Sequence, residues 1–142
     1  MYSDLAALKE RMPEQTIIDL TDDSGAGVVD QDVVDRAITD ADTEIDSYLA
    51  GRYSVPVSPV PDLLKRLSLD LAIEILYGRR PDYDATEAVV RAAKNARALL
   101  VNISSRKAEL PGVSEAETVT SSSSGAVFVS GDRLFTRSKQ QW

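Results

Sequence analysis

The segment that most restricts the fold is residues 62–77, where apolar side chains recur at nearly every helical position. Pro61 and Asp62 favour the start of a helix, and Gly78 is a typical end signal. The leucines and isoleucines lie almost all round the predicted helix, at Leu63, Leu64, Leu67, Leu69, Leu71, Ile73, Ile75 and Leu76. A helix that is apolar on every side must be covered by other elements. The sequence therefore predicts that this helix is central.

Amphipathic helices are predicted on both sides of it in the chain. Asp30 can cap a long helix that ends near Gly51 and has apolar residues at helical spacing, at Val34, Ile38, Ala41, Ile45, Tyr48 and Leu49. A later helix repeats apolar residues every three or four positions, at Val89, Ala93, Ala96, Leu100 and Ile103. Ser3 is the expected N-cap of the first of two short N-terminal helices, which Pro13 separates, and residues 53–61 with their three prolines should be extended. The predicted fold class is all-α, a compact bundle of about four to five helices.

The last part of the chain has a different composition. Pro111 and Gly112 interrupt the helical pattern, residues 118–125 are rich in serine and threonine, and short β-prone segments follow. We therefore divide the chain into a helical bundle, residues 1–111, and a Ser-rich linker with an extended C-terminal arm, residues 112–142.

The predicted arm carries apolar residues that it cannot bury by itself, because an isolated hairpin is marginally stable in water. Its candidate contacts with a neighbouring subunit or another protein are Phe128, Leu134, Phe135 and Trp142. Two alternatives stay open at this point: the arm packs back on its own bundle, or it has no fixed structure.

The composition excludes many functions. The chain contains neither cysteine nor histidine, so we expect no disulfide, no imidazole base and no common zinc site. No catalytic, cofactor-binding or metal-binding residue is assigned, and an enzyme is not expected. The net charge of −7 argues against affinity for free nucleic acid. No apolar run is long enough for a membrane span and no signal peptide is recognisable, so we expect synthesis in the cytoplasm.

Charge is distributed unevenly along the chain. Residues 1–50 carry 3 basic and 13 acidic side chains, whereas residues 51–111 carry 10 and 7. Asp35, Asp42 and Asp46 lie within about 40° of one another on a helix with about 100° per residue. They form either a solvated acidic surface or, in a ring of copies, the wall of a channel that repels DNA phosphates.

The basic counterpart is predicted in the middle third. Arg52, Arg79 and Arg80 are candidate contacts to another subunit or another protein, since head-to-tail assembly needs two different, complementary surfaces.

The loop after residue 21 resembles a calcium-binding loop only in part. With Asp22 at position 1 and Gly27 at position 6, Ala26 and Val33 occupy ligand positions 5 and 12. Neither side chain offers an oxygen, so a plain connecting loop is the favoured interpretation.

The order of several segments resembles a known family. These segments are residues 40–53 (DADTEIDSYLAGRY), the following Val55-Pro56, residues 63–78, the acidic loop and residues 133–137 (RLFTR). They resemble virion proteins of Mu-like phages and prophages and, more loosely, the small helical head–tail connector proteins of tailed phages.

The resemblance implies a structural virion protein located in the neck. It would form a ring, expected to be a dodecamer, beneath the portal protein. The ring would extend the DNA channel without binding DNA specifically, and would receive the next neck or tail component, a stopper or tail terminator. The alternative is a helical regulatory or protein-binding module that grips one partner with its arm.

Overall fold

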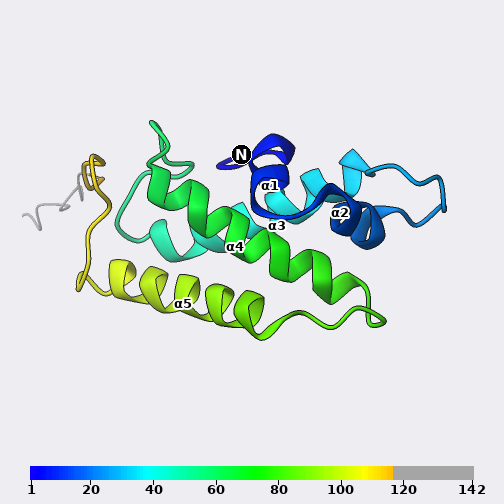
Figure 1. Cartoon of the computed structure of the whole chain (residues 1–142). Coiled ribbons are helices and arrows are strands. Elements are labelled where there is room, and N and C mark those ends of the chain that lie inside the picture. Colours follow the sequence, from blue (N-terminus) through cyan, green and yellow to red (C-terminus); the bar gives the residue numbers. More distant parts are fainter. Residues whose placement is uncertain (117–142) are drawn as a thin grey trace, which may run out of the picture.

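The computed structural model describes residues 1–116 of the 142-residue chain (Figure 1). Within these residues the elements are α1 (Leu5–Arg11), α2 (Glu14–Thr21), α3 (Gln31–Leu49), α4 (Asp62–Arg79) and α5 (Glu87–Ser104). The described part of the chain contains no β-strand. The predicted all-α bundle of four to five helices is therefore confirmed for residues 1–116.

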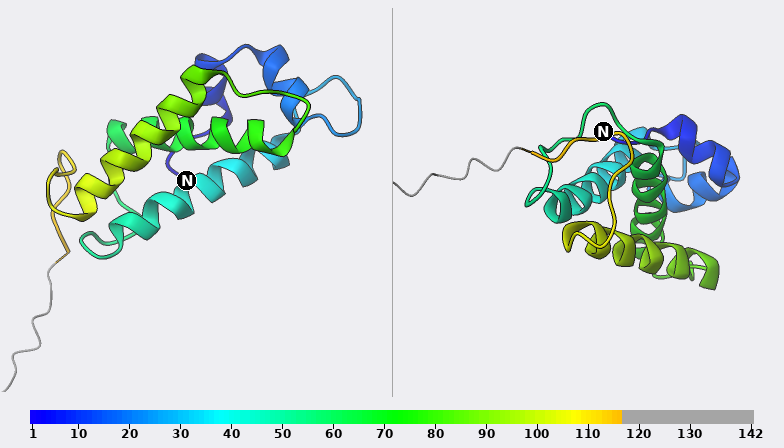
Figure 2. Two further views of the ribbon diagram at one scale, coloured as in Figure 1. Left: turned by 90° about the horizontal axis from the view of Figure 1, so that it is seen from below. Right: turned by 90° about the vertical axis from the view of Figure 1, so that its left-hand side faces the viewer.

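Helix α4 lies at the centre of the bundle, as its apolar pattern predicts. It contacts α2, α3 and α5, and Figures 1 and 2 show α3 and α5 running along it. Its most deeply buried large side chains are those of Leu64, Leu67, Leu71 and Leu76. Because burial of one leucine side chain stabilises a fold by about 1.5–3 kcal/mol, α4 contributes much of the core.

The end of α4 differs from the prediction. Gly78 is expected to end the helix, but α4 continues to Arg79. A glycine inside a helix costs only about 1 kcal/mol relative to alanine. The guanidinium groups of Arg79 and Arg80 bind backbone carbonyl groups at the end of α2 and in the loop after it, and these tertiary contacts outweigh the local stop signal.

Helices α3 and α5 are amphipathic, and each begins with a side-chain cap. The Asp30 carboxylate accepts a hydrogen bond from the Val33 backbone N–H, and the Thr86 hydroxyl accepts one from Val89. The residues that share the inner side of each helix are buried: Val34, Ile38, Ala41 and Ile45 on α3, and Ala93, Ala96, Leu100 and Ile103 on α5. The predicted helical period is therefore the one that builds the core.

The first helix begins one residue later than predicted. Asp4, not Ser3, is the N-cap, and its carboxylate accepts a hydrogen bond from the Ala7 backbone N–H at 2.8 Å. Ser3 is buried, with its hydroxyl 2.7 Å from the hydroxyl of Ser68 on α4. Both residue types cap helices well, so a contact across the fold decides between them.

The segments on either side of the long helices pack onto the bundle. Tyr53 and Val57, in the proline-containing connection between α3 and α4, are buried. After α5 the chain turns back, and the Leu110 backbone N–H donates a hydrogen bond to the Tyr53 hydroxyl at 3.2 Å.

No helix within residues 1–116 is both long enough and apolar enough to cross a membrane.

Candidate functional site

Asp42 is not on an exposed surface, which corrects its prediction as a channel-facing residue. It is buried, with 8% of its surface exposed. Its carboxylate accepts hydrogen bonds from the Tyr2 backbone N–H at 2.7 Å and from the Ser68 hydroxyl at 2.6 Å. These donors come from the N-terminal segment and from α4, neither of which the helical pattern of α3 reveals. Asp42 therefore holds the N-terminal segment and α4 of the same chain together.

Asp46 serves the same purpose one turn later. The Tyr2 hydroxyl donates a hydrogen bond to the Asp46 carboxylate and accepts one from the Val57 backbone N–H at 2.9 Å. Burial raises the pKa of the Tyr2 hydroxyl, and the hydrogen bond to Asp46 raises it further. Asp46 is half-buried, and its hydrogen-bond partner Tyr2 belongs to the same chain. Its place on a channel wall stays a prediction.

The third candidate, Asp35, stays at the surface. It is half-buried, and the neighbouring Asp32 and Asp40 are exposed. None of the three forms a salt bridge within residues 1–116. We call Asp32, Asp35 and Asp40 the acidic face of α3. These aspartates are what remains of the predicted acidic surface.

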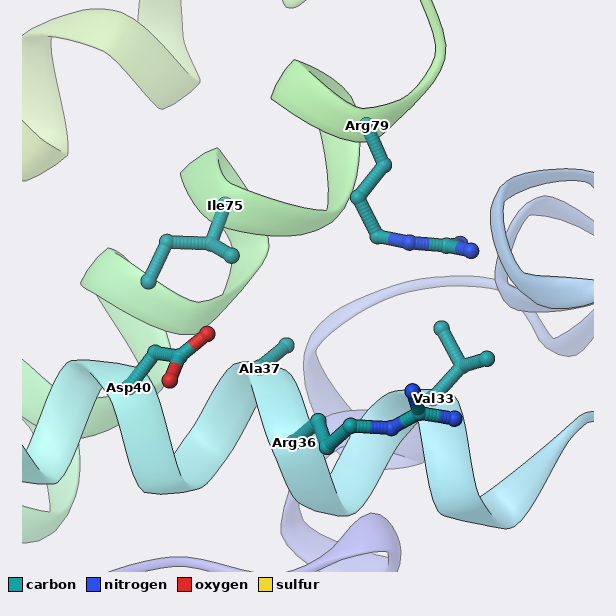
Figure 3. Close-up of a pocket in the computed structure, with 6 residues that line it drawn as sticks. All are labelled: Val33, Arg36, Ala37, Asp40, Ile75 and Arg79. Atoms are coloured by element: carbon teal, nitrogen blue, oxygen red, sulfur yellow. The ribbon is translucent and has the colours of Figure 1, made fainter.

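A groove borders the acidic face between α3 and the second half of α4. Its volume is about 240 Å³, and it is lined by Val33, Arg36, Ala37, Asp40, Ile75 and Arg79. Figure 3 shows the Asp40 carboxylate directed toward Ile75, while Arg79 turns away from the groove. The groove therefore combines an apolar floor with a rim that carries both the Asp40 carboxylate and the Arg36 guanidinium group.

Arg52 is buried instead of exposed, and its prediction as a subunit or portal contact is corrected. Only 4% of its side chain is exposed. It donates hydrogen bonds to the backbone carbonyl groups of Ile103 and Ala108 at 2.8 and 2.6 Å, and it forms an ion pair with Glu115 at 2.6 Å. The guanidinium group thus holds the end of α5 and the segment after it. The backbone N–H of Ala116 also donates to the Arg52 carbonyl group, so the first residues of the predicted arm lie on the bundle.

Arg79 and Arg80 bind groups of their own chain, and their role as contacts to another subunit or to the portal stays a prediction. Arg79 donates to the Leu20 carbonyl group at 2.9 Å and pairs with Asp23 at 2.6 Å. Arg80 pairs with the same carboxylate at 2.9 Å and donates to the Asp22 carbonyl group. Both arginines fasten the loop after α2 to the end of α4. The charges of these arginines are visible in the sequence, but the backbone carbonyl groups that accept their hydrogen bonds are not.

The loop that partly resembles a calcium site uses its first carboxylate internally. Asp22 accepts hydrogen bonds from the backbone N–H groups of Ser24, Ala26 and Gly27, the last at 2.6 Å. These donors lower the pKa of Asp22 to about 2. Within residues 1–116 no three acidic side chains are grouped so that they could hold a metal ion. The carboxylate organises the turn, which fits the plain-loop interpretation.

Helix α5 presents an outward surface that the sequence analysis did not single out. Val90 and Val101 are 48% and 49% exposed, and Arg91, Lys94 and Ala98 between them are exposed as well. We call these five residues the α5 face. A signal was present, because valines at these positions interrupt the polar side of an amphipathic helix. Arg97, by contrast, faces inward to Glu44 and Glu74 at 2.6 and 2.7 Å, and the hydrogen bond to Glu44 raises its pKa.

The remaining predicted contact residues, Phe128, Leu134, Phe135 and Trp142, lie outside the described residues.

Comparison with known proteins agrees with the resemblance seen in the sequence. A search of curated proteins finds no match. Residues 2–129, however, match the protein-family model described as Bacteriophage Mu, Gp36. Because this match covers most of the 142 residues, the chain belongs to the bacteriophage Mu Gp36 family.

Proposed function

We propose that this protein is a structural component of the virion that joins the head to the tail. It acts as a connector, or adaptor, and forms a ring, expected to be dodecameric, beneath the portal. The ring extends the DNA channel and receives the next neck or tail component. The observation that carries this proposal is the family match over residues 2–129, which makes the chain a phage protein.

The arrangement of polar groups supports a structural role. Three buried polar side chains, Asp42, Arg52 and Ser68, bind distant parts of the same chain. Such contacts hold segments that are distant in the sequence together as one rigid unit. A subunit that repeats around a ring needs this rigidity. With no histidine or cysteine in the chain, we propose no enzymatic reaction and no cofactor.

The electrostatics support passage of DNA without specific binding. Affinity for DNA comes mainly from lysines and arginines that contact phosphates. The chain carries 16 basic and 23 acidic residues, and Arg52, Arg79 and Arg97 are committed to internal carboxylates. A ring of such subunits repels a phosphate backbone, so DNA would slide past it.

In this proposal the C-terminal residues bind the portal or a neighbouring subunit. A single contact of this kind can be weak, because copies in a ring act together at high effective concentration. The predicted location is the neck of the virion, after synthesis in the host cytoplasm.

The test is electron microscopy of virion necks, or of the portal co-expressed with this protein. The expected result is a closed ring of this subunit around a central channel. A truncated variant lacking residues 117–142 keeps the Arg52–Glu115 contact and should fold, as measured by circular dichroism, but fail to dock on the portal. A matched control truncated only after residue 138 retains Phe128, Leu134 and Phe135 and should dock better.

The alternative function, a module that binds one protein with its C-terminal residues, predicts a different result. Such a module forms a complex of fixed stoichiometry with a single partner and is absent from purified particles. Finding the protein in neither particle nor portal complex would overturn the connector proposal.

A further inference from the structure

The acidic face of α3 combines negative charge with an adjoining apolar depression. Asp32 and Asp40 are exposed, and Asp35 is half-buried. Arg36 is the basic residue of α3, and its Nε donates to the Asp32 backbone carbonyl group at 3.2 Å. Beside them lies the groove with Val33, Ala37 and Ile75 at its floor (Figure 3). This surface suits a partner that brings both basic and aliphatic side chains.

The α5 face of the same molecule has these properties. Arg91 and Lys94 are exposed and form no salt bridge within residues 1–116. Val90 and Val101 leave about half of their surface exposed, and the small Ala98 lies between them. In helical projection Val90, Lys94, Ala98 and Val101 fall on one strip, since they are spaced by three or four residues. The strip is therefore continuous, aliphatic and basic.

We propose that the α5 face of one copy packs on the acidic face and groove of α3 in the next copy. The charges of the two surfaces are opposite, and the valines together with the aliphatic stem of Lys94 match the apolar floor of the groove. The two surfaces differ from each other, so their contact can repeat head to tail. This inference rests on the proposed ring and identifies its subunit contact. It places Asp32 and Asp40 in that contact, whereas Asp35 lies on the opposite edge of the exposed side of α3.

A second copy fits the α5 face better than DNA does. Two accessible cations, Arg91 and Lys94, would neutralise only about two phosphates, whereas tight DNA binding uses roughly 6–10 such contacts. Exposed valines gain nothing from phosphates but do gain from apolar contact, at roughly 25 cal/mol per Å² buried. Opposite charge also orients two copies as they approach one another.

The absence of cysteine from the chain makes site-directed cross-linking a clean test. Thr39 on the acidic side of α3 and Ala98 on α5 are both exposed. The full-length double variant Thr39→Cys/Ala98→Cys, treated with a short bis-maleimide, should give a ladder of dimers, trimers and larger species. A mixture of the two single variants should stop at the dimer, because each copy then has one reactive surface. The matched control replaces Thr39→Cys with Gln15→Cys, an exposed position on α2, and should give no ladder.

Two cross-linking outcomes would overturn the contact. Strong dimers from either single variant alone would show that like surfaces meet. A double variant that stops at the dimer would show a closed pair instead of head-to-tail repetition.

Charge reversal provides an independent measurement. The variants Asp32→Lys/Asp40→Lys and Arg91→Glu/Lys94→Glu change exposed residues, so each should keep the helical circular dichroism spectrum of the wild type. Each variant alone should lose most of its higher-order cross-links, here made with an amine-independent photo-cross-linker at position 98. A mixture of both should regain them, because reversed surfaces pair with each other. Failure of the mixture to recover would overturn the electrostatic pairing.

The outcomes separate this inference from the proposed function. A neck ring in particles without α3-to-α5 cross-links leaves the connector function standing and rejects the contact. Cross-linked ladders from a protein that is absent from virions retain the contact and reject the neck location. If Asp32→Lys/Asp40→Lys particles assemble normally but release or retain DNA abnormally, the acidic face lines the channel and the inferred contact is wrong.

Discussion

Helix α3 carries two groups of aspartates that have different roles. Asp42 and Asp46 accept hydrogen bonds from donors of the N-terminal segment and α4. Asp32, Asp35 and Asp40 have no ion-pair partner within the described part of the chain. The angular position of a carboxylate on a helix therefore does not determine its role. The donors that the rest of the fold brings to it do.

The largest effect is expected at the buried carboxylate. Replacing Asp42→Ala removes the acceptor for the Tyr2 backbone N–H and the Ser68 hydroxyl. The Tyr2 N–H loses its partner, and Ser68 keeps only the Ser3 hydroxyl. The free energy of unfolding should fall by about 3 kcal/mol, because buried donors that lose a charged partner keep their desolvation cost. Urea unfolding monitored by circular dichroism measures this. A loss of stability no larger than that caused by Asp40→Ala would contradict the distinction between the two groups of aspartates.

A smaller effect is expected for the hydroxyl group that bridges Asp46 and the α3–α4 connection. Tyr2→Phe retains the ring but removes the hydrogen bonds to Asp46 and to the Val57 backbone N–H. We expect a loss of about 1–2 kcal/mol. In a double-mutant cycle with Asp46→Asn, the two losses should not add, since both variants break the same contact. Additive losses would show that Tyr2 and Asp46 act independently.

Asp22 is a third case, because it is half-buried and accepts hydrogen bonds from several backbone N–H groups of its own loop. Its pKa lies at about 2, below the ordinary value of 3.8, owing to the backbone N–H groups of Gly27 and Ala26. A lowered pKa in the folded state means that the ionised carboxylate stabilises the protein above pH 3.8 and that this contribution disappears as the pH falls toward 2. The stability difference between wild type and Asp22→Ala should therefore narrow over this interval in unfolding measurements. A difference that is constant over the interval would mean that the carboxylate does not hold the turn.

The smallest effect on stability is expected at Asp40, one of the exposed aspartates of α3. Asp40→Asn keeps the shape of the side chain and removes a charge that has no salt-bridge partner within residues 1–116. The free energy of unfolding should change by less than about 0.5 kcal/mol, as for most surface substitutions. The same variant should weaken the association between copies, read from cross-linking yield. A large loss of stability would indicate an internal role for Asp40 and weaken its assignment to the subunit contact.

The helices could be predicted closely because their signals are local. Asp30 caps α3, and the apolar periods of α3 and α5 are buried as predicted. The misjudged ends, at Ser3 and Gly78, are those where a distant group intervenes. Ser3 is buried and forms a hydrogen bond with Ser68. Arg79, which follows Gly78, donates a hydrogen bond to the Leu20 carbonyl group at the end of α2.

The candidate site was much less predictable. Charge type and helical angle suggested Asp42, Arg52 and Arg79 as free surface groups, but each is occupied by partners 26 to 59 positions away in the chain. Helical periodicity relates residues only a few positions apart, so it cannot predict these long-range pairs. The α5 face was overlooked for a related reason: whether Val90 and Val101 are covered depends on which other segments pack against α5.

The amino-acid order was thus sufficient for the all-α class, the central place of α4 and membership of a phage family, since periodicity and the order of segments are properties of the chain alone. Only the folded arrangement decided which charges are available to other molecules. Asp42, Asp46 and Arg52 form hydrogen bonds with distant segments of the same chain. The exposed carboxylates of α3 and the cations of α5 are left, and their opposite charges identify the surfaces on which copies of this protein are proposed to meet.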